Sequence, residues 1–262
     1  MAIKVVVHGA AGKMGQELVN GLAREPGIQV VGAVDVKAQK ATYPLPDDRG
    51  TVPYSADLGK IITECRPDVI VDFSVAKATM PMVRTAAAAH VGAVIGTTGL
   101  TNAEVDEIRR LAAANKVGIV MAPNFALGAV LMMHLAKIAA KYLDYAEITE
   151  LHHHLKADAP SGTALMTARE MAKARGKPFL RPQEKAVFAS RGQEAEGVTI
   201  HSVRLPGFMA HQEVIFGAAG QTLTIRHDTI NRECYLPGVI LAVKEVGKRD
   251  GLVYGLDVLL NL

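Results

Sequence analysis

The chain has 262 residues, of which 49% are apolar and 21% are charged, and its formal net charge is +3. This length allows one large domain or two modest domains, each with its own core. Basic residues neither cluster nor alternate with aromatic ones, which argues against nucleic acid as a partner and favours small anionic ligands.

The N-terminal segment does not resemble a signal peptide, and no apolar segment reaches the roughly 18 residues of a membrane span. Cys65 and Cys234 show neither metal nor redox spacing, so we expect both to be reduced. We therefore expect a soluble, cytoplasmic protein that has no membrane partner.

The first forty residues predict a nucleotide-binding unit. A β-branched run over 3–7 predicts a buried strand, and the sequence GAAGKMG follows directly. Apolar residues at helical spacing then lead to a second strand over 28–34, which ends at Asp35. Strand, glycines, helix, strand and acid in about thirty residues are typical of dinucleotide binding. The alternative is a glycine-rich turn that binds no ligand.

This pattern predicts a role for each part of the unit. The pyrophosphate of NADH or NADPH is expected at the helix N-terminus, and Asp35 is expected to accept hydrogen bonds from the adenosine ribose. Lys37 or Lys40 could lie near a ribose 2′-phosphate, so the choice of cofactor stays open. The predicted cofactor residues of the turn are Gly9, Ala10, Ala11, Gly12, Lys13 and Met14.

The next stretches alternate between helices and strands. Residues 36–54 contain three prolines and little periodicity, which predicts a surface loop. Ser74 is a candidate N-cap for an alanine-rich helix, and Thr101 with Glu104 predicts a capping box. The other predicted elements are a helix over 57–65 and strands over 69–73, 93–95 and 117–121.

Two of these strands lead into short turns, GTTG and APNF. Because open α/β sheets bind ligands at the carboxyl ends of their strands, we interpret both turns as walls of a nicotinamide pocket. Each turn alone is also an ordinary strand end. The predicted contacts are Gly96, Thr97, Thr98, Ala122, Pro123, Asn124 and Phe125. Asn124 is expected to cap a long buried helix through Tyr142, in which His134 is a satisfied core histidine.

The densest chemistry lies at 150–164, which reads ELHHHLKADAPSGTA. If 146–156 is one strand, His152, His154 and Lys156 share one side. Residues 161–163 fit the first turn of a helix through 175, where free N–H groups favour an anion. Together these groups suit an anionic substrate that must receive a proton. A metal site and a solvated polar strand are the alternatives, but no Cys or HExxH-like spacing completes a ligand set, so we predict no metal.

The remaining sequence changes character. We predict a loop over 176–197, antiparallel strands over 198–205, 212–216 and 223–228, and a final helix from Asn231. The apolar C-terminal tail is expected to pack. His201, Arg204, His211 and His227 could contact substrate or subunits, or lie on solvated strand faces. Their roles, like that of His154, stay open.

The stretch 152–164 resembles the signature of the 4-hydroxy-tetrahydrodipicolinate reductase family, formerly called dihydrodipicolinate reductases. GAAGKM, GTTG and APNF are similar to the family's cofactor loops and occur in the same order. The resemblance runs from Gly9 to the C-terminus. Its most specific matches are His152, His153, Lys156, Asp158, Ala159, Pro160, Ser161, Gly162, Thr163 and Ala164.

The resemblance implies an α/β fold, with a Rossmann-type doubly wound parallel sheet and a second α+β domain. The nucleotide-binding domain would comprise 1–124 and 230–262, and the substrate-binding and oligomerisation domain 125–229. The family implies NAD(P)H-dependent reduction of 4-hydroxy-tetrahydrodipicolinate in diaminopimelate and lysine biosynthesis, usually by a homotetramer. Lys156 would donate a proton with His152 as its partner, while His153, Gly162 and Thr163 would hold a carboxylate of the dicarboxylate substrate.

The sequence departs from some family members at His154 and Leu155, where others carry Arg or His, and at Val36, where some carry Arg. A homoserine or semialdehyde dehydrogenase would share the two-domain plan, and a nucleotide-sensing module could bind NAD without chemistry. The run HHHLKADAPSGTA discriminates against both, since a sensor needs no adjacent proton donors.

Overall fold

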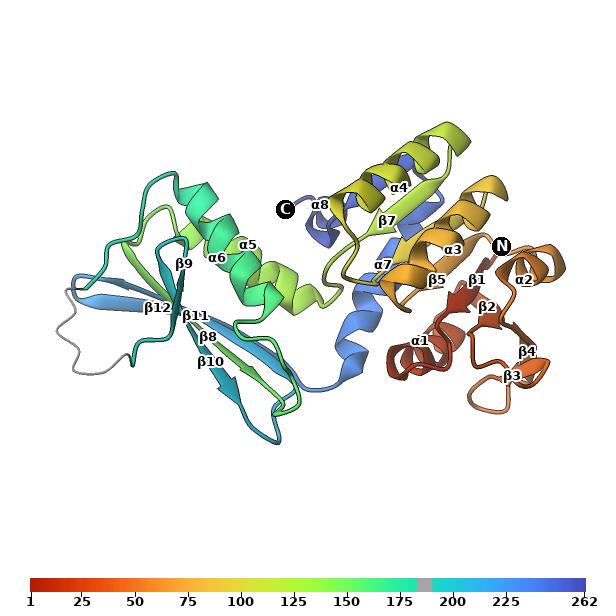
Figure 1. Ribbon diagram of the computed structural model, residues 1–262, viewed down its shortest axis with the longest axis horizontal. Coiled ribbons are helices and arrows are strands. Elements are labelled where there is room, and N and C mark those ends of the chain that lie inside the picture. Colours follow the sequence, from red (N-terminus) through yellow and green to blue (C-terminus); the bar gives the residue numbers. More distant parts are fainter. Residues whose placement is uncertain (183–189) are drawn as a thin grey trace. The chain divides into compact units, whose positions relative to one another are not determined.

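The computed structural model describes residues 1–182 and 190–262 (Figure 1). The chain forms two compact units. Unit 1 consists of Met1–Leu127 and Arg232–Leu262, and unit 2 consists of Gly128–Asn231. Unit 1 is therefore built from both ends of the chain, and unit 2 is an insertion between them.

In the described part of unit 1, eight strands form a sheet in the order β13-β7-β6-β5-β1-β2-β4-β3. All neighbours pair in parallel except β3 and β4. The strand order reverses between β1 and β5, which is where sheets of this class bind nucleotides. The strands are β1 (Ile3–His8), β2 (Ile28–Val34), β3 (Thr42–Pro44), β4 (Thr51–Ser55), β5 (Val69–Asp72), β6 (Gly92–Ile95), β7 (Gly118–Met121) and β13 (Gly251–Tyr254).

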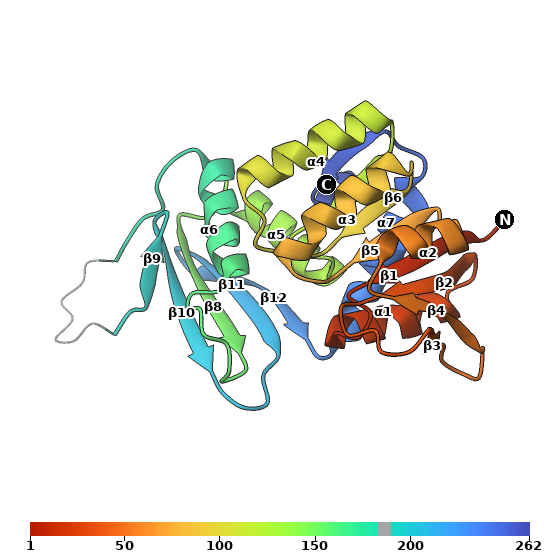
Figure 2. The ribbon, with the colours of Figure 1, turned by 45° about the vertical axis from the view of Figure 1, so that its right-hand side comes forward.

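Helices cover both faces of this sheet, so its central strands are almost wholly apolar and buried. Helices α3 and α4 pack together on one face, and α1 and α7 on the other (Figures 1 and 2). The apolar stripe of α1, including Leu18 and Leu22, is buried as predicted. The helices are α1 (Lys13–Arg24), α2 (Leu58–Cys65), α3 (Ala76–Ala88), α4 (Asn102–Asn115), α7 (Leu236–Val246) and α8 (Leu256–Leu260), with a 3-10 turn η1 (Arg232–Tyr235).

The prediction of a loop over 36–54 is wrong. This stretch contains β3 and β4, which pair with each other antiparallel, and β4 extends the sheet beside β2. Pro44 is tolerated because it lies on β3, the edge strand of the sheet. The rings of Tyr43 and Tyr54 pack edge to face, with centroids 5.2 Å apart, and this contact between the two strands has no signal in local periodicity.

Of the two predicted helix caps, one is confirmed and one is wrong. The capping box of α4 is confirmed, because the Thr101 side chain accepts from Glu104 N–H and the Glu104 carboxylate accepts from Thr101 N–H. Ser74 is not a cap: Val75 occupies the N-cap position of α3, and Ser74 Oγ donates to Asp72 instead (2.6 Å). A buried carboxylate nearby therefore outcompetes the helix terminus for this hydroxyl.

In unit 2 the described strands form a five-stranded sheet in the order β12-β11-β8-β10-β9. The predicted antiparallel sheet is in fact mixed, because β8 and β10 are parallel. Helix α6 lies between them in sequence and supplies the long crossover that a parallel pair requires. The elements are α5 (Leu127–Ala139), β8 (Tyr145–His152), α6 (Gly162–Arg175), β9 (Gln193–Ala195), β10 (Val198–Arg204), β11 (Ala210–Ala218) and β12 (Gln221–Thr229).

The core of unit 2 lies between this sheet and helices α5 and α6. Met132 and Ala136 of α5 and Met171 of α6 pack against Ile148 and Phe216 of the sheet. The predicted loop over 176–197 contains β9, and residues 183–189 of that stretch lie outside the described residues. Strand β9 was missed because a strand of only three residues, Gln-Glu-Ala, carries no periodic signal.

Helix α5 also differs from its prediction. It is shorter than expected, and Leu131, Leu135 and Ile138 are 43–49% exposed, so one side of the helix is not buried. His134 is not a satisfied core histidine, because its buried Nδ1 has no hydrogen-bond partner among the described residues. Within the described chain, no helix is both long and apolar enough to cross a membrane.

Candidate functional site

The turn after β1 is shaped by its glycines. Gly9 has a φ of +83°, a region that favours glycine, and a Cβ on Gly15 would lie 2.1 Å from the Gly9 carbonyl oxygen. Gly12 is the N-cap of α1 and provides no side-chain capping bond. The first N–H groups of α1 are therefore open to an anion, and the turn fits the pyrophosphate of a dinucleotide.

Asp35 at the end of β2 contacts the same turn. Its Oδ2 accepts from Ala11 N–H (3.0 Å) and its Oδ1 accepts from Lys37 N–H (2.9 Å). Tyr43 donates its hydroxyl to the Ala10 carbonyl (3.0 Å), and burial, followed by the charge of Asp35, raises the pKa of this phenol. Each carboxylate oxygen keeps a further lone pair, so Asp35 retains acceptor capacity for ribose hydroxyls.

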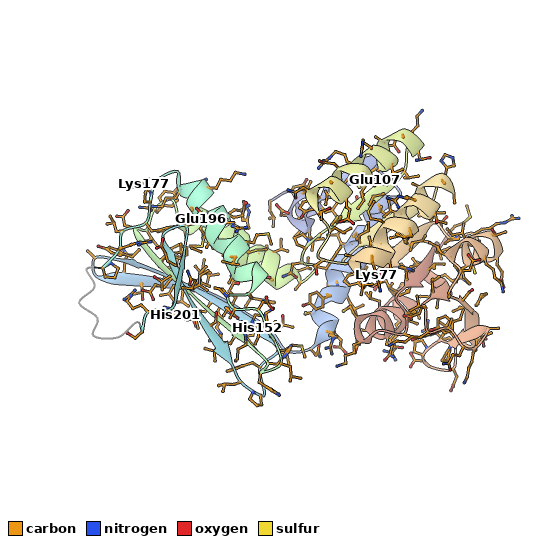
Figure 3. All side chains as sticks on the ribbon, in the orientation of Figure 1. Lys77, Glu107, His152, Lys177, Glu196 and His201 are labelled. Atoms are coloured by element: carbon orange, nitrogen blue, oxygen red, sulfur yellow. The ribbon has the colours of Figure 1, made fainter. Side chains whose placement is uncertain are left out.

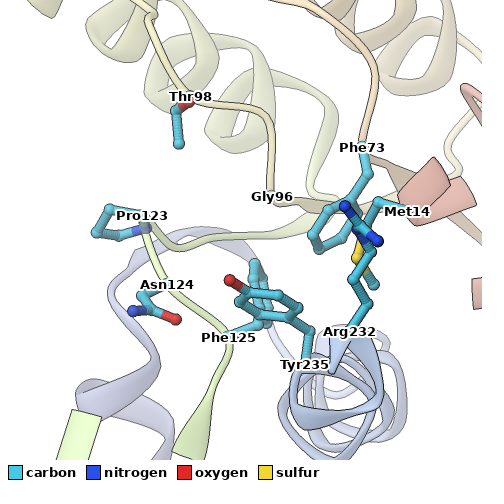
Figure 4. Close-up of a pocket in the computed structure, with 9 residues that line it drawn as sticks. All are labelled: Met14, Phe73, Gly96, Thr98, Pro123, Asn124, Phe125, Arg232 and Tyr235. Atoms are coloured by element: carbon cyan, nitrogen blue, oxygen red, sulfur yellow. The ribbon is translucent and has the colours of Figure 1, made fainter. Parts of the chain in front are cut away.

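Unit 1 contains a pocket of about 290 Å³ at the carboxyl ends of its strands (Figure 4). Sequence reasoning missed Phe73, Arg232 and Tyr235, which belong to segments without a predicted role. The lining residues are Met14, Phe73, Gly96, Thr98, Pro123, Asn124, Phe125, Arg232 and Tyr235. The structure thus brings together residues of all three predicted cofactor loops.

A buried carboxylate holds two of the strand ends near this pocket. Asp72 accepts hydrogen bonds from the hydroxyls of Ser74 (2.6 Å), Thr79 (2.6 Å) and Thr97 (2.9 Å), and from Nδ1 of His8 (2.7 Å). Burial alone would raise the pKa of Asp72, but the hydrogen bonds from His8, Ser74 and Thr79 hold this pKa below its usual value. Thr97 therefore points inward rather than into the pocket, and Ala122 is likewise buried.

In unit 2, the prediction that His152, His154 and Lys156 share one side of a strand is wrong. β8 ends at His152, which pairs with Arg204 of β10 and Ala210 of β11, the last and first residues of those strands. Without neighbouring strands, His153 and His154 form an exposed turn. The Lys156 ammonium donates to both oxygens of Asp158 (2.7 and 2.9 Å).

Glu150 is the organising residue of this region, and its side chain is fully buried. Nδ1 of His152 lies 2.5 Å from Glu150 Oε2, and Arg204 donates to both carboxylate oxygens (2.8 and 2.7 Å). The N–H of Ser161 donates to Oε1 (3.2 Å). Burial alone would raise the pKa of Glu150, but hydrogen bonds from His152 and Arg204 lower it to about 2, so the carboxylate is ionised at neutral pH.

The Ser-Gly-Thr turn begins α6 as predicted. Ser161 is the N-cap, and its Oγ accepts from Ala164 N–H (3.2 Å). Because Ser161 caps the helix, the Thr163 hydroxyl is not needed for capping. A Cβ built on Gly162 would meet no atom within 4 Å, so the space beside this residue is open. The start of α6 can therefore receive an anion.

Glu150 and Asp72 are the main residues that sequence reasoning missed. Glu150 stands two residues before His152, so strand alternation alone could have placed both on one face. Asp72 ends a buried strand, where an acidic residue has to find donors.

Two of the histidines whose roles the sequence leaves undecided have carboxylate partners outside the Glu150 cluster. His201 contacts Glu147 (2.7 Å), and His211 contacts Asp228 (2.5 Å). In the described residues, no three His, Cys, Asp or Glu side chains are grouped so as to hold a metal ion.

Comparisons with known proteins agree with this arrangement. The family model "Dihydrodipicolinate reductase, N-terminus" matches residues 3–125, and the model of its C-terminus matches residues 128–260. A 4-hydroxy-tetrahydrodipicolinate reductase of Dehalococcoides mccartyi is 58% identical over 260 residues, which cover 99% of each chain. The corresponding protein of Moorella thermoacetica is 50% identical over 264 residues, covering 99% of this chain and 98% of that one.

Solved structures give the same picture. A dipicolinate-bound dihydrodipicolinate reductase from Paenisporosarcina sp. TG-14 has a TM-score of 0.88 and 39% identity, covering 98% of this chain and 99% of that chain. An amine dehydrogenase from Mycobacterium smegmatis has a TM-score of 0.66 at 16% identity, covering 97% and 95% of the two chains, and so shares the fold alone. Both family models and the full-length relatives show that this chain belongs to the dihydrodipicolinate reductase family.

Proposed function

We propose that this protein reduces 4-hydroxy-tetrahydrodipicolinate to tetrahydrodipicolinate with NADH or NADPH, in diaminopimelate and lysine biosynthesis. Membership of the reductase family supports the reaction. The observation that carries it is the arrangement at the end of β8, where a buried carboxylate links the His152 imidazole to the anion-binding turn at Ser161. This arrangement suits a carboxylate substrate that must exchange a proton.

In this proposal unit 1 binds the cofactor, which supplies the hydride for C4 of the substrate. The open N–H groups at the start of α1 bind its pyrophosphate, and Asp35 accepts from its adenosine ribose. The pocket residues of the GTTG and APNF turns surround the nicotinamide end. Thr97 and Ala122 would act through backbone groups, because their side chains are buried.

Lys156 is the proposed proton donor. Its ammonium is paired with Asp158, whose side chain is 60% exposed, and exposed ion pairs of this kind are weak. The ammonium can therefore leave Asp158 and turn toward a substrate at little cost. His152 is proposed to share the proton transfer, since its ring is held in place by Glu150 while its other nitrogen is not bound by that carboxylate.

We assign one substrate carboxylate to His153, Gly162 and Thr163. The relative from Paenisporosarcina was solved with dipicolinate, a planar dicarboxylate, which supports this substrate class. In our structure the Thr163 hydroxyl makes no hydrogen bond within the described residues, and Gly162 leaves open space. A carboxylate here would gain the helix-start N–H groups and one hydroxyl.

We further propose a cytoplasmic homotetramer assembled through the sheet of unit 2. Cys65 is a free cysteine, which is consistent with a reducing compartment. The edge strand β12 carries exposed side chains, including Leu223, and offers a surface for a second copy. Light scattering coupled to size exclusion should give four times the chain mass of 27.8 kDa, and a monomer mass would refute this assembly.

The activity itself is tested by adding freshly made product of dihydrodipicolinate synthase to the purified protein with NADH or NADPH. Cofactor oxidation, followed by near-ultraviolet absorbance, should depend on this substrate. Omission of the synthase is the control. If neither cofactor is oxidised, the proposed function is wrong, provided that a family member assayed in parallel is active.

A further inference from the structure

We propose that Glu150 is a positioning residue for proton transfer, which fixes the His152 imidazole so that Nε2 is the atom that exchanges a proton. The same carboxylate ties this ring to the anion-binding turn through Ser161. The proposal rests on the proposed function of His152 and adds a residue outside the predicted catalytic pair.

The orientation of the proton follows from the state of Glu150. An ionised carboxylate has no proton to donate, so the contact at 2.5 Å requires that His152 Nδ1 carries the hydrogen. A neutral imidazole has one N–H, and its other nitrogen is then an acceptor. Glu150 therefore selects the tautomer in which Nε2 of His152 has a free lone pair. Once protonated, the same Nε2 becomes the donor.

Arg204 fixes the orientation of the Glu150 carboxylate. Its guanidinium bonds both oxygens of Glu150 and also donates to the Asp158 carbonyl (2.7 Å). A two-point pair of this kind fixes the plane of the carboxylate. One side chain from β10 thus holds the end of β8 and the loop that carries Lys156. The proton-transfer residues and the anion-binding turn consequently share one anchor.

A second Glu–His–Arg cluster on the same strand provides a matched control. Glu147 contacts His201 (2.7 Å) and pairs with Arg191, but its side chain is 38% exposed and is not joined to the Ser161 turn. Both histidines project from the sheet of unit 2 (Figure 3). If Glu150 only stabilised the fold, Glu150→Gln would lower stability without changing the tautomer of His152.

The experiment compares the full-length parent, Glu150→Gln and Glu147→Gln. Arg204 should recruit the new amide oxygen, which turns the amide NH₂ toward Nδ1 and shifts the imidazole proton to Nε2. We expect kcat to fall about a hundredfold or more for Glu150→Gln, as for loss of a general acid or base, with KM changed less than threefold. Glu147→Gln should keep kcat within about twofold of the parent.

The tautomer is read directly by nitrogen NMR on protein with ¹⁵N-labelled histidine, with His152→Gln used to assign the signal. The parent should show Nδ1–H, and Glu150→Gln should show Nε2–H or a mixture. An Nε2–H tautomer in the parent overturns the proposal whether or not the variant folds. An unchanged tautomer in folded Glu150→Gln, or a changed one with kcat within twofold, overturns it too.

These readings separate the inference from the proposed function. If the parent does not oxidise NADH with the substrate, the proposed reaction fails. The tautomer of the free protein still decides whether Glu150 orients His152, because that measurement needs neither substrate nor cofactor.

Discussion

Unit 1 and unit 2 each bury one carboxylate near the end of a strand, but they surround it differently. Asp72 of unit 1 is bonded by three hydroxyls, by His8 and by the backbone N–H of Ser74. Glu150 of unit 2 is bonded by a guanidinium, an imidazole and a backbone N–H. Both carboxylates are kept ionised, since the donors lower both pKa values against the effect of burial.

The different donors around the two buried carboxylates suit two different roles. The hydroxyl donors lie on the segment between β5 and α3, on α3 and on the GTTG turn, so the Asp72 network fixes these segments to one another. In the Glu150 network, the Arg204 guanidinium offsets the charge, and the same carboxylate joins His152 to the anion-binding turn at Ser161, so this network can hold a reacting group beside a bound anion. We expect damage to the unit 1 network to weaken stability and cofactor binding, and damage to unit 2 to weaken turnover.

The largest effect is expected at Lys156. Lys156→Met should lower kcat by about 10²–10⁴-fold, because a positioned general acid contributes that much, while the NADH dissociation constant stays unchanged. His152→Gln should act in the same direction but less severely. Lys177→Met is the control, since Lys177 also lies near a carboxylate, Asp144, but its side chain is 64% exposed. Turnover of Lys156→Met within twofold of the parent would remove Lys156 from the mechanism.

Acid should erase the stabilising role of Glu150. Its folded pKa of about 2 lies below the ordinary value of 4.5, so the ionised group stabilises the fold at neutral pH, and this stabilisation is lost as pH falls from 4.5 toward 2. The stability advantage of the parent over Glu150→Gln should shrink across this window by roughly 3 kcal/mol. Urea unfolding at several pH values measures it, and a constant advantage would contradict the shift.

Thr163 tests the anion site of unit 2. Thr163→Val keeps the shape but removes a hydroxyl, and losing a hydrogen bond to a charged group costs about 1.5–3 kcal/mol, or roughly ten- to a hundredfold in affinity. Calorimetric titration of the NADH complex with pyridine-2,6-dicarboxylate should show this loss, with NADH binding unaffected. Since Ser161 already caps α6, an unchanged affinity would place the carboxylate site elsewhere.

Asp72→Asn tests whether the Asp72 network of unit 1 supports stability and cofactor binding. The asparagine amide places an NH₂ where a carboxylate oxygen had accepted, so at least one donor loses its partner, at a cost of about 1–3 kcal/mol in unfolding free energy. NADH should also bind more weakly, because Ser74 and Thr97, which are held by Asp72 next to the pocket, lose part of this anchor. If stability and NADH affinity both equal those of the parent, Asp72 does not organise the pocket.

The smallest effect is expected at Asp35. We predict that the parent uses NADH and NADPH with at most a modest preference, because Lys13 and Lys37 offset the repulsion between Asp35 and a 2′-phosphate. Asp35→Ala should raise the NADH dissociation constant about two- to tenfold, which corresponds to one ordinary hydrogen bond. An unchanged constant in a fluorescence titration would show that Asp35 does not contact the ribose.

Local signals explain which features could be predicted from the sequence. The strand over 28–34, the capping box at Thr101 and the helix from Ser161 all depend on neighbouring residues, and the structure confirms them. The parallel pairing of β8 with β10 depends on partners far along the chain, and the β3–β4 hairpin pairs two short strands in a proline-containing stretch, so periodicity could not reveal either of them.

The candidate site shows the same limit. His152 and the Ser-Gly-Thr turn stand out as unusual residues in a short run, but their anchor does not. Arg204 lies 54 residues from Glu150, and His8 lies 64 residues from Asp72. Which distant donor meets a buried carboxylate depends on strand order, and strand order is a property of the whole fold.

The split construction of unit 1 has a consequence for synthesis on the ribosome. Unit 2 is complete once Asn231 has emerged, whereas β7 lacks its outer neighbour until Gly251–Tyr254 of β13 follows. Domains generally fold as units while the chain grows, so the inserted unit can finish first although its first residue appears later. A chain that terminates before residue 251 would therefore carry an intact unit 2 beside a unit 1 with an open sheet edge, the kind of edge that templates aggregation.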